Sequence, residues 1–382
     1  MAESSSDDPL VGFRQARDFT LADLDSLRVI LRGGSVIDWH RLNFRDDGDI
    51  NEFLGSHEIS LDDPDDVDRM EDVKAEAIEY LRRNFDYPIP ASIELSPAVD
   101  LFRLASAKGH KQVCACMILK VMHIIHHLQG RELAFMFPVS DQDIFRLVEE
   151  KVYRVVGGML TSGLPIVEFL GGRKQRDSLY TKLLSKRETI AAQIYDKLRF
   201  RIVTQTRDDL LPVVSYLSRK LFPFNYAIPG ESTNTILDFD RIFDEHARLR
   251  DLAPLVQGLP GDKSKPLPDN VFSAKNYRVV HFVVDLPVRI PEKYLDLLPP
   301  AAAALGRVVF VLVEFQIVDQ QTDQQNERGE ASHAKYKERQ RLAVMERLRV
   351  GFREHAAVRA HMDEQTSERI APARDPALSE ED

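Results

Sequence analysis

Residues 307–319, RVVFVLVEFQIVD, decide the fold class, because their β-branched and aromatic residues predict a long β-strand. Side chains two residues apart share one face of a strand, so Val309, Val311, Val313, Phe315 and Ile317 form a wholly apolar face. The other face carries Glu314 and Gln316 among apolar neighbours. A carboxylate in such a strand is costly to bury unless it is paired or binds a cation. The alternative is an edge strand with a solvated face.

Two more segments have the same composition, residues 199–205 (RFRIVTQ) and 277–288 (YRVVHFVVDLPV). An amphipathic helix is predicted between them at residues 208–221, which fits strands joined by crossover helices in an α/β or α+β sheet. Residues 72–158 instead show helical periodicity, with Ser140 as a predicted N-cap. We therefore expect a helical domain at 65–160, after a poorly ordered acidic segment at 1–64.

Composition narrows the class of protein. The 382 residues carry a formal net charge of −10, which argues against DNA as a partner. The two cysteines, Cys114 and Cys116, are too few for a disulfide framework and fit buried thiols in a reducing compartment. The apolar stretch 113–125 contains a lysine and is too short to span a membrane. We expect a cytoplasmic protein without a membrane partner.

Charged and aromatic residues lie at unusual places in the predicted strands. Asp196 precedes the strand at 199–205, and with Glu314 on another strand it could hold Mg²⁺, although a cap or salt bridge would also explain it. Tyr277 and His281 share a strand face and could flank a planar ligand, or His281 could be a core histidine. Three histidines at 123, 126 and 127 lack a partner carboxylate nearby, so we interpret them as helix surface.

A basic segment begins at Arg173 and ends at Arg201. It contains nine basic and three acidic residues, so the rest of the chain sums to −16. Such a segment suits a polyphosphate, whose charge requires both basic side chains and a cation. A solvated helix face is the alternative.

Four blocks resemble RelA/SpoT-type synthetase domains in the same order. They are YDKLRFRIV (195–203), FPFNYAIPG (222–230), KNYRVVHF (275–282), and VEFQI (313–317) followed by ASHAKYK (331–337). The resemblance covers about half of the chain. It implies an α+β fold, with a mixed nucleotidyltransferase-like sheet at 165–347 flanked by helices. Composition predicts a polar insertion within it at 230–269, and a helical extension with a disordered tail at 348–382.

The resemblance also implies an activity, the transfer of pyrophosphate from ATP to the 3′-hydroxyl of a guanosine nucleotide (GDP or GTP) or an adenosine nucleotide. Glu314 and Asp196 would be catalytic and would hold Mg²⁺. The implied nucleotide-binding residues are Arg173, Lys182, Lys186, Arg201, Lys275, Tyr277, His281, Gln316 and His333. Two departures from the family pattern affect substrate contacts, since Gln175 stands at a lysine position and Val318 at an arginine position. Two alternatives therefore stay open: pyrophosphorylation of the 3′ end of tRNA, and a nucleotide-binding regulatory protein without catalysis.

Overall fold

The computed structural model describes residues 13–33, 35–185, 198–237, 243, 247–252, 276–328, 332 and 334–349. They belong to two compact units, Met1–Lys174 with Tyr195–Ala331, and Gln175–Ile194 with Ser332–Asp382. The described part of the second unit contains α8 (Arg176–Ser185) and a helix at 334–349. Arg347 donates a hydrogen bond to the Leu184 carbonyl and so links these two helices.

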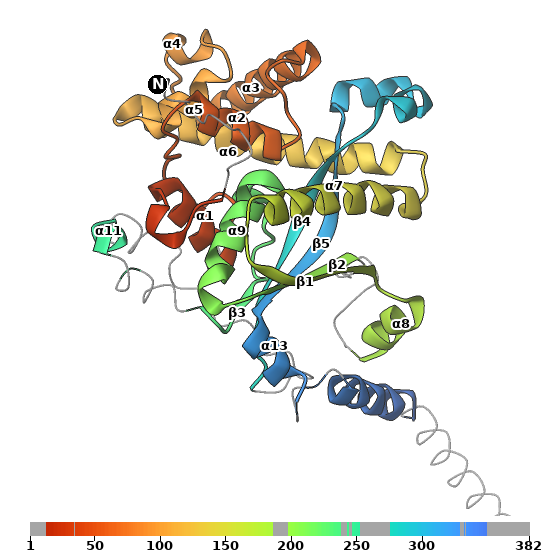
Figure 1. The fold of residues 1–382 in the computed structure, drawn as a ribbon. Coiled ribbons are helices and arrows are strands. Elements are labelled where there is room, and N and C mark those ends of the chain that lie inside the picture. Colours follow the sequence, from red (N-terminus) through yellow and green to blue (C-terminus); the bar gives the residue numbers. More distant parts are fainter. Residues whose placement is uncertain are drawn as a thin grey trace, which may run out of the picture. The chain divides into compact units, whose positions relative to one another are not determined.

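The first unit contains a five-stranded mixed sheet (Figure 1). Its strands are β1 (Ile166–Arg173), β2 (Leu198–Thr204), β3 (Thr233–Asn234), β4 (Val280–Arg289) and β5 (Val308–Asp319). In space they follow the order β1-β2-β5-β4-β3, with β2 and β5 parallel and the other pairs antiparallel. The predicted strands at 199–205, 277–288 and 307–319 are thus present, and the expected mixed sheet is confirmed.

One face of the sheet is a row of aromatic rings that crosses four strands. Phe169, Phe200, Phe315 and Phe282 are stacked, with successive ring centroids 5.7–5.8 Å apart. Helix α9 (Leu210–Lys220), predicted at 208–221, packs near this row, and Phe222 just after it lies against the rings of Phe282 and Phe315. This aromatic face is therefore the core of the unit.

The N-terminal segment differs from the prediction. Residues 1–64 were expected to be poorly ordered, whereas the structure contains α1 (Leu21–Arg32) and α2 (Asp47–Ser56) in this range. Thr20 and Asp23 form a capping box at the start of α1. Leu24, Leu27 and Ile30 of α1 are fully buried. Burial of this apolar stripe stabilises α1, although the acidic composition of the segment had predicted poor order.

The predicted helical region consists of α3 (Pro64–Phe85), α4 (Ala91–Glu94), α5 (Asp100–Ser106), α6 (His110–Met136) and α7 (Asp141–Thr161). Ser140 caps α7 as predicted, because its side chain accepts a hydrogen bond from the Asp143 N–H. These helices share a hydrophobic core with the sheet. A boundary between a helical domain at 65–160 and the sheet is therefore not observed.

Helix α6 lies against β5, and Gly130 of α6 is at the point of closest approach. A Cβ on Gly130 would lie 2.3 Å from the Phe310 ring and 2.7 Å from the Val308 carbonyl oxygen. Cys114 and Cys116 on this helix are buried, as expected. By length and composition alone α6 could cross a membrane, and 44% of its most apolar window is buried in this structure.

Shorter elements connect the main ones. The described helices among them are η1 (Ala16–Asp18), η3 (Arg207–Asp209), η4 (Phe224–Tyr226), α11 (Ala247–Arg250), η5 (Glu292–Leu297), η6 (Pro300–Leu305) and α13 (Gln320–Asn326). Helix α13 follows β5 directly, at the C-terminal end of that strand (Figure 1). Asp319 caps it by accepting a hydrogen bond from the Thr322 N–H.

Candidate functional site

The polar residues of β5 face away from the aromatic row. The register places Glu314 opposite Arg199 of β2 and Val283 of β4. It places Gln316 opposite Arg201 and His281. Directly opposed residues on neighbouring strands project from the same face of a sheet. Strand alternation therefore gathers five polar side chains from three strands on one face.

Glu314 is the buried centre of this group and is 6% exposed. Its Oε1 accepts a hydrogen bond from Gln316 Nε2 at 2.6 Å and lies 3.3 Å from His281 Nε2. A buried carboxylate is expensive unless it is paired, and these two contacts offset part of that cost. The interpretation of 307–319 as an edge strand with a solvated face is wrong, because β5 is the central strand of the sheet.

Arg201 and Tyr277 complete the group. Arg201 forms an ion pair with Asp323 of α13 and lies near the Tyr277 hydroxyl. Burial raises the pKa of Tyr277; Arg201 opposes this shift and Glu314 adds to it. The hydroxyl therefore stays protonated at neutral pH. We refer to Glu314, Gln316, His281, Arg199, Arg201 and Tyr277 as the Glu314 cluster.

The backbone next to Tyr277 is held by one side chain of α13. Asn326 is 2% exposed, and its Oδ1 accepts from the Arg278 N–H at 3.0 Å while its Nδ2 donates to the Arg278 carbonyl at 2.7 Å. On the other side of the chain, the Val279 N–H donates to Thr235 Oγ1 at 2.8 Å. These bonds fix the entry to β4 and with it the position of the Tyr277 ring.

Other predicted residues lie elsewhere. Arg173 pairs with Leu198 in the sheet register, so its side chain projects from the aromatic face, opposite the Glu314 cluster. There it forms a two-bond ion pair with Glu149 of α7, at 3.0 and 2.9 Å. The structure does not bring Arg173 to the cluster, because strand alternation directs it to the wrong face. Lys182 lies in α8, within the second unit.

Four predicted residues fall outside the described part of the chain: Asp196, Lys186, Lys275 and His333. For Asp196 and Glu314 the structure gives only the strand arrangement. Asp196 stands two residues before β2 in the sequence, and β2 is the parallel neighbour of β5. The meeting of the two carboxylates at one metal ion stays a prediction.

The cluster offers oxygen ligands that suit a hard cation. Magnesium beside phosphates takes one or two protein carboxylates, with its other ligands from phosphate and water. Glu314 supplies one such carboxylate. Within the described residues, no group of three or more His, Cys, Asp or Glu side chains could hold a metal ion. The cluster therefore fits a cation that is held jointly with the phosphates of a substrate.

Two residues of the site were missed in the sequence, Asp323 and Asn326. Both belong to the short helix α13, which starts directly at the end of β5 and ends at Asn326. The signal for it was Asp319 followed three residues later by Thr322, which is a pattern for a helix start. A polar helix of this length carries no apolar stripe, so its presence could not be read from periodicity.

The chain is similar to known proteins at the level of solved structures. No protein-family model matches the sequence, and no curated protein matches it. Among solved structures, the chain is similar to small alarmone synthetase 2 from Bacillus subtilis, with 16% identity and a TM-score of 0.30 over 62% of this chain and 95% of that one. Small alarmone synthetase 1 from the same organism, bound to its product pppGpp, has 16% identity and a TM-score of 0.26, with 63% and 96% covered.

A third similar structure is a GTP pyrophosphokinase family protein from Streptococcus pneumoniae, with 15% identity and a TM-score of 0.29 over 58% of this chain and 91% of that one. These are proteins of the type that the four sequence blocks resemble. Identities and TM-scores this low assign no activity. Any assignment of function therefore depends on the residues of the Glu314 cluster.

Proposed function

We propose that the Glu314 cluster transfers a pyrophosphate group from ATP to the 3′-hydroxyl of a second nucleotide, with GDP or GTP as the acceptor. The observation that carries this proposal is a buried carboxylate, Glu314, on the same sheet face as Arg201 and beside Tyr277. A carboxylate, cationic side chains and an aromatic ring are what a reaction between two nucleotides requires. The four sequence blocks support the same reaction.

Each side chain has a role in the proposed reaction. Glu314 accepts the proton of the acceptor's 3′-hydroxyl while the 3′-oxygen attacks the β-phosphorus of ATP. The bond from that phosphorus to the oxygen shared with the α-phosphate breaks, and AMP leaves. Arg199 and Arg201 stabilise the charge of the transferred group. The ring of Tyr277 stacks on the acceptor base.

Magnesium, when bound, supplies charge stabilisation on the transferred phosphates. Glu314 is the described residue that would hold it, together with Asp196 as the sequence predicts. Arg201 already contacts Asp323 and Tyr277, but a guanidinium has five N–H donors. Two contacts thus fix its plane and leave donors for a phosphate oxygen.

The test is a transfer assay with ATP radiolabelled at the γ-phosphate, magnesium, and GDP, GTP or deacylated tRNA as separate acceptors. Chromatography should show label on a 3′-pyrophosphorylated guanine nucleotide and an equal amount of AMP. Glu314→Gln keeps the size of the side chain but removes the base, so kcat should fall by about 100-fold or more. Glu79→Gln, at an exposed carboxylate on α3, is the matched control and should keep full activity.

Failure of all acceptors with the intact protein would contradict the transfer reaction. A specific observation then favours nucleotide binding without catalysis: Arg173 is paired with Glu149 on the other face of the sheet. Without Arg173, the Glu314 cluster would still bind a nucleotide through Arg201 and Tyr277. Calorimetry with GTP would detect that function, and Tyr277→Ala should weaken the measured affinity.

A further inference from the structure

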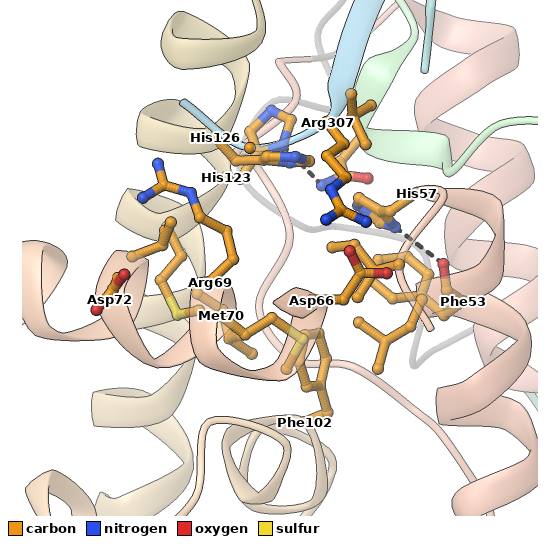
Figure 2. A pocket seen from close by; sticks show the side chains of 18 of the residues that line it. Phe53, His57, Asp66, Arg69, Met70, Asp72, Phe102, His123, His126 and Arg307 are labelled. Carbon is orange, nitrogen blue, oxygen red and sulfur yellow. Dashed lines mark hydrogen bonds between the residues drawn. The ribbon is translucent and has the colours of Figure 1, made fainter. Parts of the chain in front are cut away.

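A cavity of about 400 Å³ lies among α2, α3 and α6, away from the Glu314 cluster (Figure 2). No residue of that cluster lines it. Segments far apart in the sequence meet here, including α5 through Phe102 and η4 through Asn225 and Tyr226. Its volume is within the range of small-molecule sites in proteins, which bind mainly through apolar walls and a few placed polar groups.

The walls are apolar and partly aromatic. They include Trp39, Phe53, Met70, Phe102, Leu119 and Met122. Figure 2 shows Met70 and Phe102 on one side and His123 and His126 across from them, with His57 beside Phe53. Such walls favour a flat apolar body over a hydrated ion.

The polar side of the cavity has an unsatisfied acceptor. Asn225 is 5% exposed, and its Nδ2 donates to His123 Nδ1 at 3.0 Å. Its Oδ1 is buried and has no hydrogen-bond partner among the described residues. A buried amide oxygen without a partner costs stability, which a ligand that donates a hydrogen bond would recover. Because Nδ1 of His123 accepts, its Nε2 carries the ring proton and is a donor.

Two more histidines line the cavity in the neutral form. His57 Nδ1 donates to the Phe53 carbonyl at 2.9 Å, which leaves Nε2 as an acceptor. His126 Nδ1 lies 3.2 Å from the Tyr226 hydroxyl. Burial lowers the pKa of His57 to about 4 and that of His126 to about 3. The histidines were predicted on a helix surface, yet His123 and His126 line an interior cavity.

Three of the charged residues that line the cavity form ion pairs. Arg307 forms an ion pair with Asp65, and Asp66 pairs with Arg289 at 2.7 Å. The lining contains four aspartates (Asp65, Asp66, Asp68 and Asp72) and two arginines (Arg69 and Arg307), a formal charge of −2 that disfavours an anion. The three histidines also do not form a metal site by the geometry of the described residues.

We propose that this cavity binds an uncharged, planar heteroaromatic molecule of one or two rings, such as a free nucleobase. A ring N–H or amino group of the ligand donates to Asn225 Oδ1, and a ring nitrogen or carbonyl accepts from His123 Nε2. The apolar walls cover the two faces of the ring. This site goes beyond the proposed transfer reaction and does not depend on it.

The single tryptophan of the chain is a direct reporter, because Trp39 lines the cavity. The full-length protein is titrated with adenine, cytosine and nicotinamide while tryptophan emission is measured. At least one probe should give a saturable change with a dissociation constant of about 1 mM or lower. Sodium phosphate should give none. A phosphate response without a response to any heteroaromatic probe would overturn the proposal.

Two cavity variants locate the site. Asn225→Ala removes the acceptor and should weaken the responding probe by about fivefold or more. Met122→Phe fills the space and should abolish the response, which keeps the proposal testable if Asn225→Ala does not fold. Circular dichroism and thermal unfolding verify the fold of both. Tyr277→Ala, in the Glu314 cluster, should leave the affinity unchanged. Loss of binding in Tyr277→Ala, or unchanged binding in both cavity variants, would overturn the proposal.

Discussion

At the scale of single residues, Tyr277 contributes two groups to the Glu314 cluster, a ring and a hydroxyl. The proposed reaction uses the ring as a stacking surface for the acceptor base, while the hydroxyl lies near Arg201. Stacking of a base on an aromatic ring is worth about 1–3 kcal/mol. The two groups can be separated by substitution.

Tyr277→Ala is predicted to raise the KM for the acceptor by about 10-fold, with little change in the KM for ATP. Tyr277→Phe keeps the ring and should stay within about threefold of the original protein. Steady-state kinetics with each nucleotide varied in turn gives both constants. An equal rise of the acceptor KM in Tyr277→Phe and Tyr277→Ala would show that the hydroxyl matters and the stacking does not.

Strand alternation in the sequence predicted which side chains of the Glu314 cluster share a strand face. Alternation in 307–319 put Glu314 and Gln316 on one face of their strand, and alternation in 277–283 put His281 on the same face as Tyr277. Both placements depend only on the two-residue period of a strand. Arg173 could not be placed in the same way. Whether it faces the cluster or α7 depends on the register of β1 with β2, which no local pattern contains.

At the scale of elements, Asn326 of α13 replaces a missing strand partner for the chain at Arg278. Asn326→Ala should raise the KM for the acceptor several-fold, because the Tyr277 ring loses its fixed position, and it should affect the KM for ATP less. Asn326→Asp keeps the acceptor for the Arg278 N–H and loses the donor, so an intermediate KM is expected. If Asn326 has a purely structural role, Asn326→Ala would instead lower the melting temperature without raising the KM for the acceptor nucleotide more than the KM for ATP.

The contact of α6 with β5 gives a stability prediction. Gly130→Ala should lower the free energy of unfolding by about 2 kcal/mol or more, because its Cβ would overlap the Phe310 ring and the Val308 carbonyl. Gly157→Ala on α7 is the matched control, since no described heavy atom lies within 4 Å of its Cβ. There the substitution should stabilise by up to about 1 kcal/mol. Urea unfolding measures both, and an equal effect of the two would contradict the close approach.

The sequence predicted long, strongly patterned elements better than short or weak ones. Three of the five strands were read from their β-branched and aromatic composition. Strand β1 was missed because Gly171 and Gly172 interrupt it, and glycine carries no strand preference. Helix α1 was missed although Leu24, Leu27 and Leu31 have helical spacing, because the acidic composition of the segment outweighed that pattern.

At the scale of the whole molecule, buried neutral histidines couple stability to pH. The pKa of His57 is about 4 in the folded state, against 6.5 for an ordinary histidine, because of burial. The unfolded chain therefore binds a proton at a higher pH than the folded protein does. Stability is fully present above about pH 6.5 and is lost as pH falls from there to about 4.

The expected loss from His57 alone is about 3 kcal/mol over that window. His57→Gln should flatten the decline of the unfolding free energy between about pH 7 and pH 5. The exposed His110 on α6 is the control, and His110→Gln should keep the original slope. Denaturant unfolding at several pH values gives the slopes. An unchanged slope in His57→Gln would mean that other groups, such as His123 and His126, cause the acid sensitivity.

The division of the molecule was not predictable from composition. A helical domain and a sheet domain were expected, whereas helices and sheet share one core, and the segments 175–194 and 332–382 form the second unit. The composition of the chain changes where helices give way to strands. Whether the helices and the sheet share one core depends on long-range contacts such as that of α6 with β5. Those contacts are not visible in any local stretch of sequence.

The central claim is that one face of the sheet, around Glu314, binds two nucleotides. A crystal structure of the Glu314→Gln variant with ATP, GDP and magnesium tests it most directly. The account predicts the acceptor base against the Tyr277 ring, with the ATP phosphates at Arg199 and Arg201. Nucleotides bound on the aromatic face, or only outside the Glu314 cluster, would contradict it.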